Sequence, residues 1–116
     1  MYKVSINDKL EKLYIDIEDR YTCNGGIVRI HNEPKGYGNS GFCKLVKNDN
    51  SYIITNHTNN KWNKIDDKFL NIILSKDTVE NITGECCGYS WLERSKHYKV
   101  ELKSGEVLYF IFEFLD

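Results

Sequence analysis

The run Val107–Leu115 constrains the fold most, because its β-branched and aromatic side chains fall on both sides of a β-pleat. A strand of that kind is covered on both faces and lies centrally in a sheet. A second β-rich run, Val100–Lys103, precedes it, and a Ser104–Gly105 turn separates the two. The sequence therefore predicts that the chain closes its hydrophobic core with its final residues.

Glu113 interrupts this apolar run on one face of the predicted strand. A buried carboxylate is costly unless it is paired. Two interpretations stay open: the face reaches solvent near the strand end, or Glu113 pairs with a cation such as Arg29, Arg94 or a lysine.

Residues 7–20 are predicted to form an amphipathic helix, with Asn7 as its N-cap. The side chains at helical spacing are Leu10, Leu13, Tyr14, Ile17 and Tyr21. An alternation of apolar side chains across 13–17 leaves a strand as the alternative. A second helix is predicted over residues 62–76. Its apolar face would hold Trp62, Ile65, Phe69, Ile72 and Ile73.

The remaining apolar segments are typical of strands. They are residues 27–31, 42–47, 52–55, 82–92, 98–103 and 107–115. The second and third would form a hairpin over 48–51, where the side chains favour a turn. The whole predicts an α+β fold with a mostly antiparallel sheet of about five to six strands and two helices packed against it. A chain of 116 residues is long enough for one domain, so we expect a single α+β domain over 1–116.

Charge and hydropathy exclude several classes of protein. Sixteen Lys and Arg stand against seventeen Asp and Glu, for a net charge of −1. A protein that depends on phosphate contacts usually carries a basic excess, so nucleic-acid and anionic-membrane binding are disfavoured. Neither a signal-peptide core nor a run of about 18 apolar residues is present. We therefore expect a cytoplasmic protein with reduced thiols and no membrane partner.

The segment Gly36–Gly41 matches the glycine pattern G-x-G-x-x-G. In dinucleotide-binding folds that pattern joins a strand to a helix, whereas here the following residues predict a strand. We interpret it as a connecting loop. A small nucleotide- or phosphate-binding domain or enzyme that uses this loop remains the first alternative. A single-stranded nucleic-acid binder, built on the 44–47 hairpin and Tyr52, is the second.

No arrangement of histidines or cysteines has the spacing of a metal or nucleophile site. The vicinal pair Cys86–Cys87 would place its two thiols on opposite faces of a strand, and the four cysteines are interpreted as small buried hydrophobes. The sequence therefore predicts no catalytic residue, no metal and no cofactor.

Acidic side chains near aromatic ones are the candidates for a partner-binding surface. Tyr and Trp are common anchors of interfaces, and carboxylates complement a basic partner. The candidate residues are Asp16, Glu18, Asp19, Tyr37, Trp62, Asp66 and Asp67.

In its small size, near-neutral charge with acidic clusters and composition rich in Asn, Lys and Ile, the chain resembles the small immunity (antitoxin) proteins of bacterial contact-dependent growth inhibition and related polymorphic toxin systems. The resemblance implies a non-enzymatic protein that neutralises a cognate toxin, such as a nuclease, by occluding its active site or substrate cleft. It also implies a monomer when free and a heterodimer with the toxin.

Overall fold

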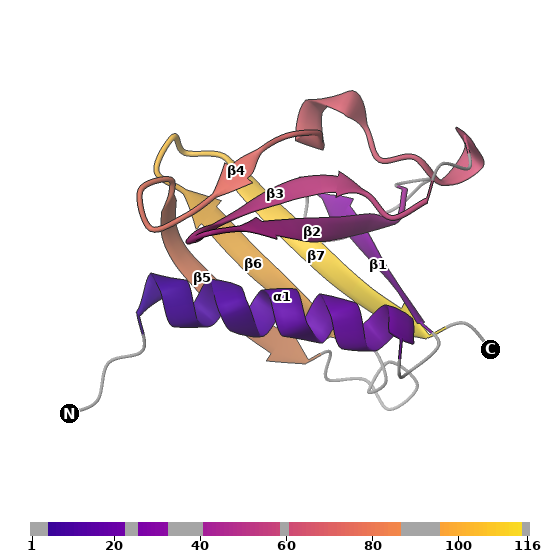
Figure 1. Ribbon diagram of the computed structural model, residues 1–116, viewed down its shortest axis with the longest axis horizontal. Coiled ribbons are helices and arrows are strands. Elements are labelled where there is room, and N and C mark those ends of the chain that lie inside the picture. Colours follow the sequence, from indigo (N-terminus) through magenta and orange to yellow (C-terminus); the bar gives the residue numbers. More distant parts are fainter. Residues whose placement is uncertain (1–4, 23–25, 33–40, 59–60, 87–95, 115–116) are drawn as a thin grey trace.

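The structure, a computed structural model, describes residues 5–22, 26–32, 41–58, 61–86 and 96–114, which form one α-helix and two antiparallel sheets (Figure 1). In chain order the elements are α1 (Ile6–Thr22), β1 (Gly26–His31), β2 (Cys43–Asn48), β3 (Ser51–Asn56), the 3₁₀ turns η1 (Lys61–Asn63) and η2 (Asp67–Phe69), β4 (Ile73–Leu74), β5 (Val79–Cys86), β6 (Lys96–Leu102) and β7 (Val107–Phe114).

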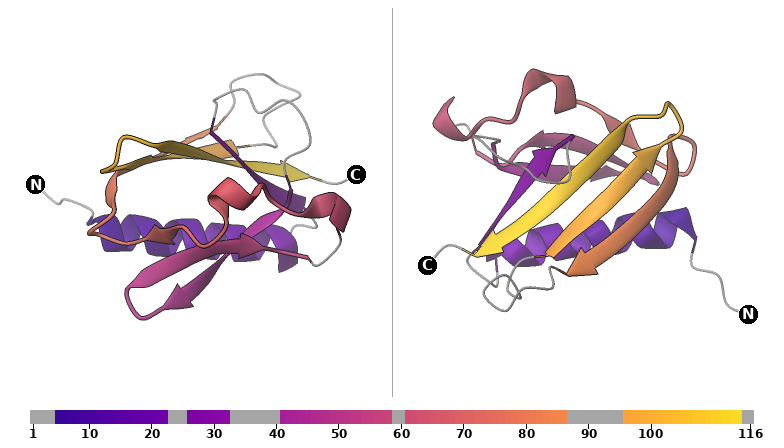
Figure 2. Two further views of the ribbon diagram at one scale, coloured as in Figure 1. Left: turned by 90° about the horizontal axis from the view of Figure 1, so that it is seen from above. Right: turned by 180° about the vertical axis from the view of Figure 1, so that it is seen from behind.

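The two sheets are stacked in layers and enclose the core. The four-stranded sheet has the order β1-β7-β6-β5, and the three-stranded sheet has the order β2-β3-β4. Figure 2 shows α1 and the three-stranded sheet side by side on one face of the four-stranded sheet. The predicted α+β class is confirmed. The predicted single sheet with two α-helices is wrong, because the strands divide between two sheets and α1 is the only α-helix in the described residues.

The helix α1 forms where the apolar spacing predicts it. Leu10, Leu13 and Ile17 are fully buried beneath the sheets. Its N-terminus differs from the prediction, because the Ser5 hydroxyl, not Asn7, accepts a hydrogen bond from the Asp8 N–H at 3.1 Å. A side-chain oxygen three residues ahead of that N–H satisfies a donor that the helix leaves without a partner.

The second predicted helix, over 62–76, is wrong. The segment instead forms two short 3₁₀ turns and the strand β4, which pairs with β3. Ile54 donates its N–H to the Ile72 carbonyl at 3.0 Å and accepts from the Asn71 N–H at 2.9 Å, and Asn71 has a φ of 67° that no helix interior accommodates. The chain contains no alanine, so hydrogen bonds to a neighbouring strand outweigh a weak helix propensity.

The strand β7 lies between β1 and β6, so its predicted central position is confirmed. Its side chains alternate: Leu108, Phe110 and Phe112 are buried, whereas Tyr109 and Ile111 are half-buried. The prediction that both faces are fully covered is therefore wrong. One face packs against α1 and the three-stranded sheet, and the other meets partial solvent.

The other strands follow the predicted segments closely. The hairpin of β2 and β3 is confirmed, with Asp49 at a φ of 54° in its turn. The strands β5, β6 and β7 form the expected meander, although β5 begins earlier, at Val79, and residues 87–92 lie outside the described part of the chain. Within the described residues, no helix is long and apolar enough to span a membrane.

Candidate functional site

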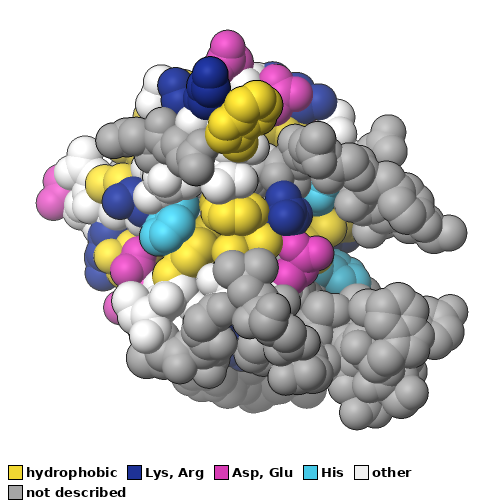
Figure 3. Space-filling view, turned by 90° about the vertical axis from the view of Figure 1, so that its right-hand side faces the viewer, with side chains coloured by type: hydrophobic (Ala, Val, Ile, Leu, Met, Phe, Trp, Pro, Cys, Tyr) yellow, Lys and Arg dark blue, Asp and Glu magenta, His cyan; other side chains and the backbone are white. Residues whose placement is uncertain are grey.

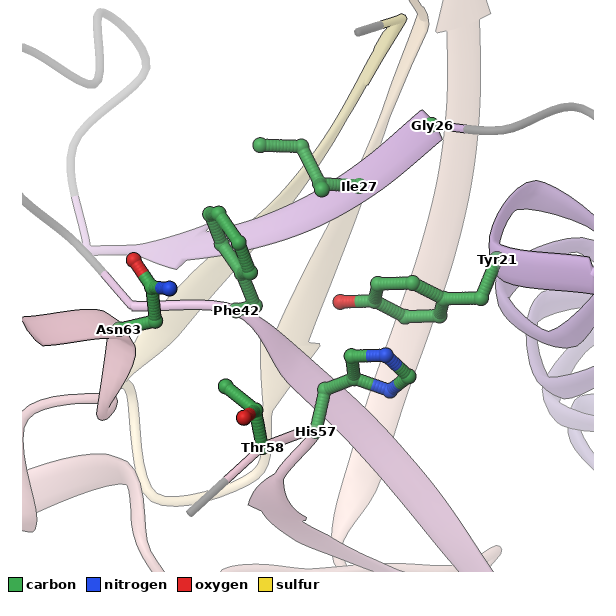
Figure 4. Close-up of a pocket in the computed structure, with 7 residues that line it drawn as sticks. All are labelled: Tyr21, Gly26, Ile27, Phe42, His57, Thr58 and Asn63. Carbon is green, nitrogen blue, oxygen red and sulfur yellow. The ribbon is translucent and has the colours of Figure 1, made fainter. Parts of the chain in front are cut away.

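A pocket of about 390 Å³ lies at the end of the molecule where α1 ends and where β1 and β2 begin. Figure 4 shows its residues coming together from α1, β1, the two ends of the β2–β3 hairpin and η1. The lining residues are Tyr21, Gly26, Ile27, Phe42, His57, Thr58 and Asn63. Each side chain in this lining is uncharged or, for histidine, neutral when deprotonated.

Tyr21 connects three elements at the base of the pocket. Its hydroxyl lies 2.6 Å from the Cys43 carbonyl oxygen of β2 and accepts a hydrogen bond from the Val28 N–H of β1 at 3.2 Å. The phenol carries one proton, and the shorter contact identifies the Cys43 carbonyl as its acceptor. Burial, reinforced by the neighbouring Cys43 thiol, raises the pKa of Tyr21, so the hydroxyl stays protonated and able to donate.

Replacing Tyr21 by phenylalanine is expected to lower the free energy of unfolding by about 1–3 kcal/mol, because the Val28 N–H and the Cys43 carbonyl lose their shared partner. Urea denaturation measures this loss. Tyr14→Phe is the matched control, since Tyr14 is a half-buried tyrosine of the same helix whose ring packs against Tyr52. Equal losses in the two variants would show that the Tyr21 hydroxyl does not join the sheets.

His57 forms the wall next to Tyr21. The two rings are stacked, with centroids 3.6 Å apart and planes 9° from parallel. The backbone N–H of His57 donates to the Phe42 carbonyl at 2.9 Å, which fixes the residue after β3 ends. Although the residue as a whole is exposed, the Tyr21 ring removes water from one face of the imidazole. This partial burial, helped by Lys44 and opposed by Glu18, lowers the pKa of His57.

We expect His57 to titrate at a lower pH in the folded protein than in the urea-unfolded chain. Because the folded state binds this proton less tightly, His57 reduces the stability of the fold as the pH falls below its ordinary pKa of 6.5. Imidazole proton shifts in an NMR titration measure the midpoint. Lys44→Gln should raise that midpoint and Glu18→Gln should lower it. A midpoint equal to that of the unfolded chain would contradict the prediction.

Phe42 and an ion pair border the other side of the pocket. The Arg29 guanidinium lies over the Phe42 ring, 5.0 Å from its centroid, and Arg29 Nε contacts Glu113 Oε2 at 2.6 Å. Both interpretations left open for Glu113 therefore hold in part, because its carboxylate pairs with Arg29 and its side chain is also 42% exposed. Figure 3 views this end of the molecule, where hydrophobic side chains occupy the middle of the face and charged and histidine side chains surround them.

Gly41 explains part of the glycine pattern by close packing. A Cβ at this position would lie 2.1 Å from the Lys64 carbonyl oxygen, and the next residue, Phe42, donates its N–H to the Asn63 carbonyl at 2.9 Å. The strand β2 follows, as the sequence predicts, in place of the helix that a dinucleotide site needs. Residues 36–40 lie outside the described residues.

Trp62 stands beside the pocket and is 79% exposed. Its neighbour Asn63 lines the pocket, and the Lys61 ammonium lies 5.2 Å from the Trp62 ring centroid. The backbone that follows Trp62 is anchored, because the Asn63 carbonyl accepts from the Phe42 N–H and the Ile65 N–H donates to the Asn56 side chain at 2.6 Å. The indole is thus held out to solvent by an ordered turn.

Three of the predicted binding residues occupy this same segment. Trp62 lies in η1, Asp66 directly precedes η2 and Asp67 begins it, and both aspartates are exposed. Lys61, Lys64 and Lys68 alternate with them, so the segment is not an anionic patch.

The other predicted residues do not join this group. On α1, Asp19 is exposed, whereas Glu18 is half-buried and Asp16 is half-buried and accepts a hydrogen bond from the Tyr98 hydroxyl. Figure 1 shows α1 and the β3–β4 connection on opposite sides of the three-stranded sheet. Tyr37 lies outside the described residues.

The residues that sequence reasoning missed are Tyr21, Phe42 and His57. The helical spacing identified Tyr21 only as a core residue, and it does pack against the core. Phe42 and His57 carried no spacing signal, because they meet only when the two ends of the β2–β3 hairpin close. The β2–β3 register, which brings Phe42 and His57 together, is not available from the sequence alone.

Metal and stacking chemistry receive no support from the part of the chain that the structure describes. It contains no group of three or more His, Cys, Asp or Glu side chains that could hold a metal ion. Cys43 is buried, as predicted, and burial raises the pKa of its thiol. Cys23, Cys87 and the side chain of Cys86 lie outside the described part. Tyr52, the ring of the nucleic-acid alternative, is only 3% exposed and cannot stack on bases.

Comparison with known proteins found no similar protein. No protein-family model matches the chain, and neither a curated protein nor a solved structure matches it. The arrangement of Trp62, the pocket and the Arg29–Glu113 pair is therefore interpreted from its own physical chemistry.

Proposed function

We propose that this protein binds another protein and occludes it, as an immunity protein does to its cognate toxin. The observation that carries the proposal is Trp62, a tryptophan that is 79% exposed on an anchored turn beside a pocket. Exposing an indole forgoes the stabilisation of roughly 1.5–3 kcal/mol that burying a large apolar side chain supplies. A binding partner that covers the indole recovers it.

The surroundings of Trp62 have the composition of a binding hot spot. Trp, Tyr and Arg dominate the energetics of protein interfaces, and Arg29 and Tyr21 border the adjoining pocket. The Asn63–Phe42 and Ile65–Asn56 hydrogen bonds hold the turn before a partner arrives. Association then orders few additional side chains, which lowers its entropic cost.

Charge at the rim would guide association and set specificity. Asp66 and Asp67 are exposed and interleaved with lysines, so this surface fits a partner of mixed charge better than it mimics a run of phosphates. If the partner is a nuclease with a basic cleft, the two aspartates are the groups that would meet it. Of the α1 carboxylates, Asp16 is bonded to Tyr98 and Asp19 is exposed, whereas Glu18 is close enough to His57 to affect its pKa.

Reversing both aspartates, in Asp66→Lys/Asp67→Lys, is expected to slow association with the partner about 3–10-fold and to reduce its dependence on ionic strength. The dissociation rate should change little, because rim charges act mainly on encounter. Surface plasmon resonance at several salt concentrations measures both rates. Asp8→Lys/Asp77→Lys, which reverses two exposed carboxylates that are not among the predicted binding residues, is the charge-matched control. Equal slowing of association in both variants would show that Asp66 and Asp67 have no specific role in binding.

Affinity capture from native lysate, followed by identification of what is retained, tests the function itself. The expected result is one protein retained by the wild type and lost with Trp62→Ala. Expression of that protein alone should then inhibit bacterial growth, and co-expression with this chain should restore it. If the retained protein leaves growth unaffected, the proposal of a protein-binding role stands, but the proposal that the partner is a toxin fails.

A further inference from the structure

The pocket beside Trp62 has features that select its occupant. Three of its walls are rings, from Tyr21, Phe42 and His57, and Figure 4 shows the Phe42 and Tyr21 rings on either side of the space with His57 next to Tyr21. Aromatic pairs gain about 0.5–1.5 kcal/mol beyond the area that they bury. A ring is therefore favoured over an aliphatic group of the same size.

The described part of the pocket lining favours an uncharged occupant. The described lining residues carry no carboxylate, ammonium or guanidinium, and the Arg29 guanidinium, which lies over the Phe42 ring, is paired with Glu113 at 2.6 Å. The lining also includes the amide of Asn63 and the hydroxyl of Thr58, and Figure 4 shows Asn63 next to Phe42 and Thr58 next to His57. An uncharged ring with a hydrogen-bonding edge matches this lining.

The exposure of the lining limits how deeply an occupant is enclosed. Ile27 and Gly26 are buried at the base, whereas Tyr21, Phe42, Thr58 and Asn63 are only half-buried. Sites for free cofactors usually cover 70–90% or more of the ligand surface. A shallow recess next to an exposed tryptophan suits the end of a side chain that a protein presents.

We propose that this pocket receives one aromatic side chain with a polar edge, a tyrosine or a tryptophan, from the protein that covers Trp62. This inference rests on the proposed function and names the chemistry of the contact. The partner's ring would lie against Phe42 and the Tyr21–His57 pair, and its hydroxyl or indole N–H would reach Asn63 or Thr58. Trp62 would then project into the partner, and the pocket would receive a side chain from the partner, within one interface.

N-acetyl-tyrosinamide and N-acetyl-tryptophanamide are the probes, and N-acetyl-leucinamide and N-acetyl-lysinamide are the controls. In ¹H–¹⁵N and aromatic NMR spectra, the first two should shift the resonances of Phe42, His57 and Thr58 saturably, with dissociation constants on the order of 1–10 mM. The controls should bind at least fivefold more weakly. Equal binding of leucinamide and tyrosinamide, or shifts elsewhere, would overturn the inference.

Two variants test the pocket from different directions. His57→Ala removes an exposed ring but keeps the backbone hydrogen bond to Phe42, and Asn63→Phe places a side chain in the space. Each should weaken binding of tyrosinamide at least fivefold, whereas His97→Ala, on the outer face of the four-stranded sheet, should not. Unchanged binding in both pocket variants would refute the site, and adenosine binding more tightly than either amide would replace the side chain by a free small ligand.

The outcomes separate this inference from the proposed function. If Trp62→Ala abolishes capture of the partner and both pocket variants capture it normally, the function stands and the pocket is not part of the interface. If the amides bind in the pocket and Trp62→Ala captures the partner normally, the aromatic site stands and the Trp62 interface fails.

Discussion

Replacing Phe110 by alanine is expected to lower the free energy of unfolding by about 3–5 kcal/mol. Phe110 is fully buried in β7, the strand that pairs with both β1 and β6, so truncating its side chain leaves a cavity in the core. Chemical denaturation measures the loss. A loss of this size is a large part of the total stability of a small domain. Phe110→Leu, which should lose about 1 kcal/mol, keeps the measurement possible if the alanine variant does not fold.

Ile111→Ala is the matched control for this prediction. Ile111 is the next residue of the same strand, but it lies on the half-buried outer face. It should lose about 1 kcal/mol, roughly half the value of a fully buried aliphatic side chain. Equal losses at 110 and 111 would mean that both faces of β7 are covered, as the sequence alone suggests.

The contrast between these two residues shows what a hydrophobic pattern leaves open. The run Val107–Leu115 predicted a central strand, and the strand order confirms it, because apolar side chains on both faces are typical of that position. The pattern does not distinguish a face that meets a second layer from one that is only partly shielded. The ion pair of Arg29 with Glu113 on the outer face shows the difference, since Arg29 comes from a strand distant in sequence.

The 62–76 segment shows a second limit. Its apolar residues recur at helical spacing, yet Ile65 and Phe69 are buried while Trp62 and Ile73 are exposed. The segment forms two short 3₁₀ turns and a strand instead of an α-helix, so the helical spacing does not correspond to one buried face. Pairing with β3, which depends on the fold of a separate hairpin, decides the conformation here, and local propensity cannot reveal it.

The candidate site divides in the same way. Trp62, Asp66 and Asp67 were predicted together because they are close in sequence, and the structure places them on one exposed segment. The pocket next to them depends on tertiary contacts between α1, β1 and the ends of the β2–β3 hairpin. These contacts are set by strand register and by the order of the layers, so Tyr21 and His57 become neighbours only in the folded chain.

Replacing Trp62 by alanine is therefore expected to weaken partner binding by at least about 2 kcal/mol, or roughly 30-fold in the dissociation constant. Truncation removes the largest exposed apolar contact of the described surface, and the effect should appear mainly in the dissociation rate. The stability of the free protein should change little, because the indole is 79% exposed. Surface plasmon resonance or calorimetry with the captured partner measures the affinity, and urea denaturation measures the stability.

Two exposed isoleucines distinguish a binding hot spot at Trp62 from a contribution that any exposed apolar side chain would make. Ile73, 50% exposed on the three-stranded sheet, and Ile15, 48% exposed on α1, offer apolar surface away from the pocket. Ile73→Ala should leave the affinity within about 0.5 kcal/mol, as expected for a residue outside the contact. A loss at Ile15→Ala that exceeds the loss at Trp62→Ala would transfer the interface to the helix, where Asp19 and Glu18 supply the charge. A large loss at Trp62 alone would place the anchor on the turn between β3 and β4, where hydrogen bonds at Asn63 and Ile65 hold the backbone that follows the exposed ring.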